Sequence, residues 1–378
     1  MIHRLRFVLP WAFLVSGTTA LFAVVDRGFP PWTALGFVLG TFLGQEPLSD
    51  LWLLLTHRLT GARHVIASYG HGRLLWHGTV AGVPVSVGMR PTTGLRLSWG
   101  LLPVRAARLR FWACSVGWLA VHAGLGVWLA ASCTGLARGV GLGLLSTLAL
   151  ILLLQGPTPV NSAWAVLVMP FRPRALDPHL WSTRDLAAER LLCRGLIPEA
   201  RAALDGPAPA WSGRTRLSAA GVALAEGRYD EADRIVALAL EQGCDPGQAY
   251  GVAAMVIVCR GDSGELAPAR AGALLGPALE VFGHNDHAKL RSVLAAADLA
   301  RFNGDPEVAV RAARRHTVEA QLSPYWRAHA GCSLAAALIA AGKPEQARKA
   351  LDRARRACPG LSRIADVERL LERPVEVA

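Results

Sequence analysis

The chain has 378 residues, of which 52% are hydrophobic and 18% charged, and its formal net charge is +12. A soluble chain of this length predicts two domains, but the charge is unevenly distributed. Residues 1–156 hold twelve Arg, no Lys and three acidic residues, a net charge of +9, whereas residues 157–378 carry only +3. The excess lies among apolar segments, and no basic patch with interleaved aromatic residues occurs, which argues against a nucleic-acid partner.

Long apolar segments in the first half predict membrane helices. The first has 19 residues, enough to cross about 30 Å of hydrocarbon, and no clear cleavage site follows it, so we expect a retained helix. A Gly-Pro-Thr-Pro sequence cuts the last, short segment from the helix before it. That segment either re-enters the membrane or completes a broken helix. The expected helices are at about 7–25, 32–56, 111–131 and 140–155, with the short segment at 160–171.

Residues 62–100 have a different pattern, with short β-prone runs interrupted by Gly. This pattern predicts a hairpin or small sheet, which we place against the membrane face. Arginines are frequent around it, and the positive-inside rule therefore places this segment and the N-terminus in the cytoplasm. Four spans return the chain to the cytoplasm near Arg172 and Arg184. A fifth crossing by 160–171 would place the rest of the chain outside.

The second predicted helix contains Glu46 and Asp50, which are four residues apart and therefore share a helix face. Ionisable groups at membrane depth are costly, and this makes them candidates for a functional site. The alternative is a tilted helix in which this stretch lies in a polar interior or near the membrane surface.

A Gly-Ala-Arg sequence at 61–63 follows this helix, and twelve residues before it lies the sequence Ser49 to Leu53. The order of segments over about 32–178 resembles the site-2-type intramembrane zinc metalloproteases, in which the corresponding helix carries HExxH. The resemblance places Asp50 at the general-base position, and Ser49 and Leu53 at the two zinc-binding His positions. The run 117–121 corresponds to the family's G-P-x-A-N-type sequence, and Asp177 to its third zinc ligand.

The resemblance implies a protease-like fold that has lost its chemistry. A catalytic zinc needs three protein ligands and an open position for water. Leu53 has no donor atom, Ser49 is a poor zinc ligand, and Asp177 alone cannot hold the ion. We therefore expect no catalytic residues, no metal and no other cofactor. Two alternatives stay open: an active metalloprotease with atypical ligands, and a membrane-tethered repeat adaptor unrelated to proteases.

Other polar residues do not assemble a recognised site. The histidines at 57, 64, 71, 77 and 122 have no ligand spacing with a third partner, and we interpret them as interfacial or packed side chains. The His-Asn-Asp-His sequence at 284–287 is interpreted as a polar loop between helices. Seven cysteines without a CxxC pair predict reduced, packed thiols. The excess of Arg over Lys, 37 to 3, is typical of a GC-rich bacterial genome.

Residues 186–372 predict helix after helix, with Ala and Leu at helical spacing. A Gly followed by a helix-starting residue and then by Ala recurs at steps of 32, 34, 43 and 38 residues, which indicates a solenoid of helical hairpins. The glycines of this recurring signature are Gly195, Gly227, Gly304 and Gly342, with a looser copy at Gly261. The clearest copies, 222–243 and 336–360, resemble tetratricopeptide repeats (TPR).

In the TPR-like copies, Ala232 and Ala347 are expected to let paired helices approach closely. The resemblance implies a groove lined by the first helix of each pair, where a protein partner binds. Four aromatic residues are candidate contacts, although a core position is the alternative for each of them. They are Trp211, Tyr250, Tyr325 and Trp326.

The sequence therefore predicts a mostly α protein: a polytopic membrane helix bundle with a small β insertion over 1–175, followed by a cytosolic TPR-like α-solenoid over 186–372. We expect a multi-pass protein of the cell membrane, with its N-terminus and repeats in the cytoplasm. Its expected partners are a protein, bound by the repeats, and the lipid bilayer.

Overall fold

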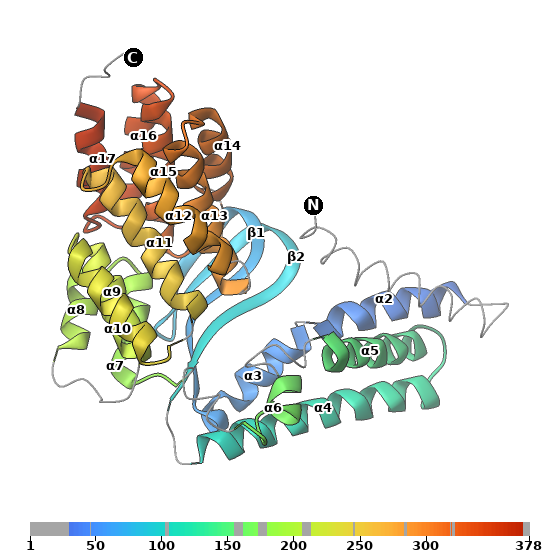
Figure 1. The fold of residues 1–378 in the computed structure, drawn as a ribbon. Helices are drawn as coiled ribbons and strands as arrows, with labels where there is room; N and C mark the ends of the chain where they lie inside the picture. Colours follow the sequence, from blue (N-terminus) through green and yellow to red (C-terminus); the bar gives the residue numbers. More distant parts are fainter. Residues whose placement is uncertain are drawn as a thin grey trace. The chain divides into compact units, whose positions relative to one another are not determined.

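The computed structural model is mostly helical with one small sheet, as the sequence predicts (Figure 1). The structure describes residues 30–45, 47–102, 106–154, 162–172, 180–205, 213–244, 246–282, 286–317, 319 and 322–372. The predicted first helix, 7–25, lies outside the described residues.

The chain forms two compact units. Unit 1 contains Met1–Trp52 and Trp112–Phe171, and unit 2 contains Leu53–Phe111 and Arg172–Ala378. This division differs from the predicted one, in which the β segment belongs with the membrane helices of 1–175. The β segment instead lies in the same unit as the helical repeats.

The apolar helices of unit 1 differ in length. Helix α4 (Ala107–Ser132) and helix α5 (Gly135–Leu154) are the two described helices that are long and apolar enough to cross a membrane. The predicted helix 32–56 is divided into α2 (Pro31–Gln45) and α3 (Pro47–Thr60). A proline lacks the N–H group and clashes with the preceding helical turn, which explains the division before Pro47. In the described part of the segment 160–171, which begins at residue 162, the helix is α6 (Ser162–Leu167).

Glycines let α2 and α5 pack backbone against backbone. A Cβ atom added to Gly36 or Gly40 of α2 would lie 2.0 or 2.2 Å from a carbonyl oxygen of α5. The facing Gly139 and Gly143 of α5 would place theirs 2.1 and 2.3 Å from carbonyl oxygens of α2. Both pairs have the Gly-x-x-x-Gly spacing that allows membrane helices to approach closely.

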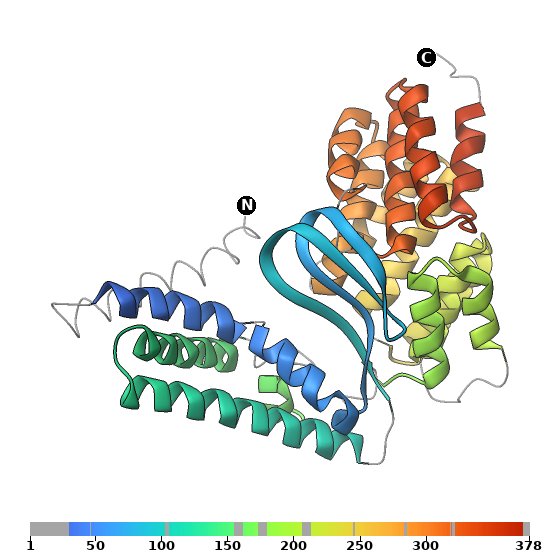
Figure 2. The ribbon, with the colours of Figure 1, turned by 180° about the vertical axis from the view of Figure 1, so that it is seen from behind.

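The sheet in unit 2 consists of β1 (Ala62–Val80) and β2 (Val83–Leu101), two antiparallel strands of 19 residues. Ala81 and Gly82 form the connecting turn and both have positive φ, 49° and 80°, as a two-residue hairpin turn with the right twist requires. Ala67 pairs with both Leu97 and Val85, so the hairpin curls back on itself (Figure 2).

The hairpin packs on the repeats through contacts from both strands. Trp181 donates its backbone N–H to the carbonyl of Leu101 at 2.7 Å, and Arg190 Nε donates to the carbonyl of His64 at 2.7 Å. The backbone N–H of Gly72 donates to Glu319 Oε1 at 3.1 Å. A hairpin of this length is marginal alone, and the repeats supply the surface that it needs.

The repeats are helical hairpins that stack in chain order. The first helix of each hairpin is α7 (Thr183–Cys193), α9 (Gly213–Ala225), α11 (Pro246–Ser263), α13 (Asp286–Phe302) and α15 (Pro324–Ala340). The second is α8 (Ile197–Leu204), α10 (Tyr229–Glu241), α12 (Pro268–Phe282), α14 (Pro306–Thr317) and α16 (Pro344–Ala357), and α17 (Arg363–Glu372) ends the array.

The predicted turn glycines adopt the left-handed conformation that ends a helix. Gly195, Gly227, Gly304 and Gly342 have φ values between 69° and 84°. In the fifth hairpin the backbone N–H of Lys343 donates to the carbonyl of Leu338 at 2.8 Å, which closes the turn. The looser copy was assigned to the wrong residue, because Gly261 lies inside α11 and the turn residue with φ of 89° is Gly264.

We expect Gly40→Ala to destabilise unit 1, because the new methyl group has to displace the α5 backbone. Gly124→Ala is the matched control, since an added Cβ in this α4 glycine meets no atom within 4 Å. The control should leave stability unchanged or raise it by up to about 1 kcal/mol through helix propensity. Thermal unfolding of the detergent-purified protein measures both, and equal midpoints for the two variants would contradict the close packing.

Candidate functional site

The structure does not describe the side chains at the protease-like positions. Ser49, Asp50 and Leu53 all lie on α3, but their side chains fall outside what the structure describes, as do Glu46 and Asp177. Within the described parts of the chain, no three His, Cys, Asp or Glu side chains are placed to hold a metal ion. The ligand set that the resemblance implies stays a prediction.

The described histidine of unit 1 is packed between two helices. His122 of α4 is buried, and its Nε2 lies 3.0 Å from the carbonyl oxygen of Leu144 on α5. Its ring meets Trp118 edge to face at 5.0 Å. Of the sequence at 284–287, His284 and Asn285 lie outside the described residues.

The candidate aromatic contacts of the repeats occupy core positions. Tyr325 is buried, and Trp326 and Tyr250 are partly buried against hydrophobic clusters. Trp211 lies outside the described residues. The five cysteines of the repeats are buried and free, as predicted, and burial raises the pKa of the Cys332 thiol to about 12.

The last helix packs against the first helices α11 and α15, the elements expected to line a binding groove. The backbone N–H of Ser362 donates to the carbonyl of Ala225 at the end of α9, at 3.0 Å. Cys358 Sγ lies 3.6 Å from the carbonyl oxygen of Gly195. One hydrophobic cluster contains residues from both the first and the last hairpins, and α17 covers part of α11 and α15.

A buried ionic network holds α17 in this position. Arg363 is fully buried, and its Nε donates to Asp262 Oδ2 of α11 at 2.8 Å. Its Nη2 lies 3.2 Å from Asp298 Oδ1 of α13, and its Nη1 donates to the carbonyl of His329 on α15 at 3.2 Å. Arg301 Nη2 contacts Asp262 at 2.5 Å, so two arginines balance two aspartates.

The network sets the protonation of its members. Burial alone lowers the pKa of Arg363, but Asp298 and Asp262 more than offset this and hold the pKa well above its usual value. Burial, and then the positive charge of Arg363, hold the pKa of His329 well below its usual value. The ring nitrogens of His329 have no hydrogen-bond partner among the described residues, and Tyr325 packs edge to face on the ring at 4.7 Å.

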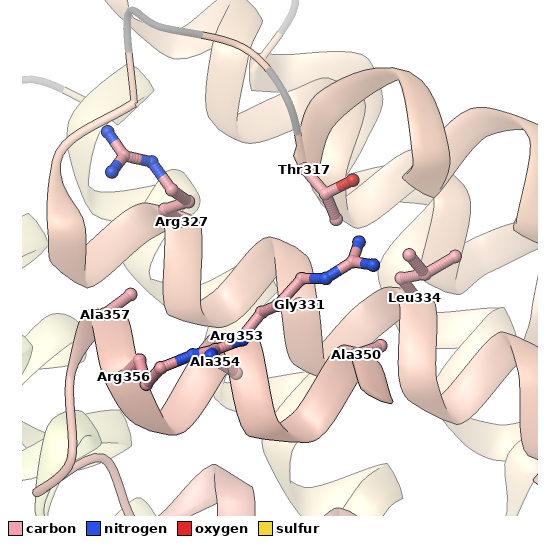
Figure 3. Close-up of a pocket in the computed structure, with 9 residues that line it drawn as sticks. All are labelled: Thr317, Arg327, Gly331, Leu334, Ala350, Arg353, Ala354, Arg356 and Ala357. Atoms are coloured by element: carbon pink, nitrogen blue, oxygen red, sulfur yellow. The ribbon is translucent and has the colours of Figure 1, made fainter. Parts of the chain in front are cut away.

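The outer side of the array carries a cavity of about 340 Å³ between α14, α15 and α16 (Figure 3). Small residues of α15 and α16 form its floor, among them Gly331, Ala350 and Ala354. Arg353 and Arg356 of α16 lie at its edge, and the Arg353 side chain extends toward Thr317 at the end of α14 (Figure 3). This surface combines a hollow with positively charged side chains.

Sequence reasoning missed both features. On α16 the arginines alternate with acidic residues, a pattern that resembles an ordinary solvated helix face. The network joins residues up to 101 positions apart, and single charged residues such as Arg363 carry no local signal of burial. A hint lay in Asp298, which follows a run of three Ala inside a helix, where charge is unusual.

Comparison with known proteins assigns the chain to no family. No model of a known protein family matches the chain, and no curated protein or solved structure matches it. The structure itself defines a protein of helical hairpins with two helices that are able to span a membrane.

We expect Arg363→Met to lower the free energy of unfolding by about 3–5 kcal/mol, because it leaves buried carboxylates without their partner. Adding Asp298→Asn should restore much of the loss, since Asp262 keeps its contact with Arg301. Arg348→Met on α16 is the control, because its side chain is 56% exposed and its carboxylate partner 78% exposed, and it should change stability by less than about 1 kcal/mol. Urea unfolding measures all three, and equal effects of Arg363→Met and Arg348→Met would contradict the network.

His329 should make the repeats sensitive to acid. Its folded-state pKa is lowered, so the unfolded chain binds a proton first as pH falls below about 6.5. The stabilisation associated with neutral His329 is therefore present above that pH and is lost as pH falls toward the lowered folded-state pKa. His329→Phe should flatten the decrease of the urea midpoint between pH 7.5 and 5.0, and an unchanged slope would contradict this assignment.

Proposed function

We propose that this chain is an integral membrane protein without catalytic activity, whose TPR-like repeats bind a protein partner in the cytoplasm. The membrane assignment is supported by α4 and α5, which have mean hydropathies of 1.5 and 2.0. Only 22% and 33% of their apolar windows are buried within the protein, which leaves most of this surface for lipid. The arginine-rich residues around 58–110 support a cytoplasmic position of the repeats.

The partner is proposed to bind the outer cavity. Helix α17 packs on two of the first helices, so a groove between them has no room for a ligand in this conformation. The observation that carries the proposal is the cavity between α14, α15 and α16, with Arg353 and Arg356 at its edge. Exposed arginine beside a concave apolar surface is typical of protein interfaces.

The protease-like ancestry is proposed as the origin of the membrane helices. It rests on the order of segments over 32–178, and on Asp50 and Asp177 at the family positions. The missing histidines favour a silent bundle over an active enzyme. Metal analysis of the purified protein separates these possibilities, because near-stoichiometric zinc that is lost in Asp177→Ala would show a working site.

Site-specific photocrosslinking tests the partner site. With a photoreactive residue at Arg353, full-length protein in its native membranes should give a discrete protein adduct. The matched probe at Arg348, an exposed residue of the same helix that pairs with Glu345, should not. The adduct from position 353 should also weaken when Arg356 is replaced by Gln. Adducts of equal yield from both positions, or from neither, would contradict this site.

A further inference from the structure

The arginines of α16 fall into two sets. Arg348 pairs with Glu345, and Arg355 pairs with Asp352 and Glu368. Two of these pairs join residues three apart on α16 and the third joins α16 to α17, and all three are exposed pairs in which acidic and basic residues neutralise each other.

The other two, Arg353 and Arg356, line the cavity and form no ion pair with the described residues. The cavity lining contains no acidic side chain among the residues that the structure describes. On α16, the arginines that line the cavity therefore have no ion-pair partner among the described residues, whereas the arginines outside its lining are paired with acidic residues.

The surroundings add positive charge to the cavity. Arg327 of α15 lines it, with its guanidinium pointing away from Arg353 (Figure 3), and its Nη2 donates to the carbonyl of Leu322 at 2.8 Å. Burial lowers the pKa of Arg327, and the pKa of His77 on β1 is lowered by burial and by the charge of Arg327. The last turn of α14, which ends at the cavity residue Thr317, also contains Arg314 and Arg315. An anion entering the cavity therefore meets arginine side chains and no acidic side chain among its lining residues.

The floor of the cavity is apolar, which restricts the anions that fit it to those with an apolar part. Leu334 and the small residues of α15 and α16 offer space for a hydrocarbon side chain. The Thr317 hydroxyl donates to the carbonyl of Arg314 at 3.0 Å, so its free lone pairs can accept an N–H group. A free phosphate offers no apolar body to fill this floor. A peptide offers a carboxylate, an apolar side chain and a backbone N–H together.

We propose that the cavity binds an acidic segment of the partner protein. Its carboxylates pair with Arg353 and Arg356, where guanidinium and carboxylate form charge-assisted hydrogen bonds. An adjacent apolar side chain fills the floor, and a backbone N–H reaches Thr317. This inference rests on the proposed function and names the chemistry of the partner at that site.

Fluorescence anisotropy tests the proposal on the full-length protein in detergent. The probe is a labelled pool of hexapeptides that alternate Glu with Leu, Val or Phe, and the comparison pool has Gln in place of Glu. The Glu pool should bind at least tenfold more tightly. Arg353→Gln with Arg356→Gln should remove this preference, whereas Arg348→Gln with Lys349→Gln, which removes the same charge from the same helix, should change affinity less than twofold.

Three results would overturn the proposal. Equal binding of the Glu and Gln pools excludes carboxylate recognition. Equal losses in the two double variants indicate attraction to net charge alone. Binding of phosphatidylglycerol vesicles that depends on Arg353 and Arg356, without binding of the Glu pool, assigns the cavity to lipid. If photocrosslinking at position 353 still captures a protein in the first two cases, the proposed function stands and only the acidic chemistry is lost.

Discussion

The architecture of the repeats depends on one buried side chain, the guanidinium of Arg363. Burying an ion costs several kcal/mol, and this cost is offset only where the geometry satisfies the whole group. Arg363 finds such a place where α11 and α13 each present an aspartate and α15 presents a carbonyl. A shift of α17 by one turn would bury the guanidinium without its carboxylate partners, and would leave both carboxylates to share the single charge of Arg301. The network therefore contributes specificity of position more than it contributes stability.

Fixing α17 has a consequence for recognition. In an open array, the first helices of the hairpins line a concave surface that is free to bind a ligand. Here Ser362 and Cys358, on the segment leading into α17, contact the ends of α9 and α7, so the last hairpin meets the first two. The hollow that carries arginines lies elsewhere, between α14, α15 and α16, and it is the surface on which we propose that a partner binds. The described aromatic candidates stay in the core.

Features that depend on local backbone conformation and repeat spacing were predicted from the sequence. Four turn glycines were identified correctly because only glycine adopts positive φ without strain, and Ala232 and Ala347 are fully buried, as the repeat spacing required. The turn at Gly264 was assigned three residues too early because α11 is longer than its neighbours. The charged network and the cavity could not be predicted, because they depend on which distant helices meet. The glycine spacing of α2 and α5 was visible in the sequence, but its partner helix was not.

The β-hairpin of β1 and β2 makes contacts with residues that are far away in the sequence. It lies in the chain between α3 and α4, yet its described hydrogen bonds to other elements lead to the repeats, at Leu101, His64 and Gly72. Glu319, which accepts the bond from Gly72, is only two residues from Thr317 on the cavity wall. Glu319 therefore ties the hairpin to a point that is close in sequence to the cavity lining. The two residues of this contact are 247 positions apart, and Gly72 belongs to a segment that the sequence pattern assigned to the membrane domain.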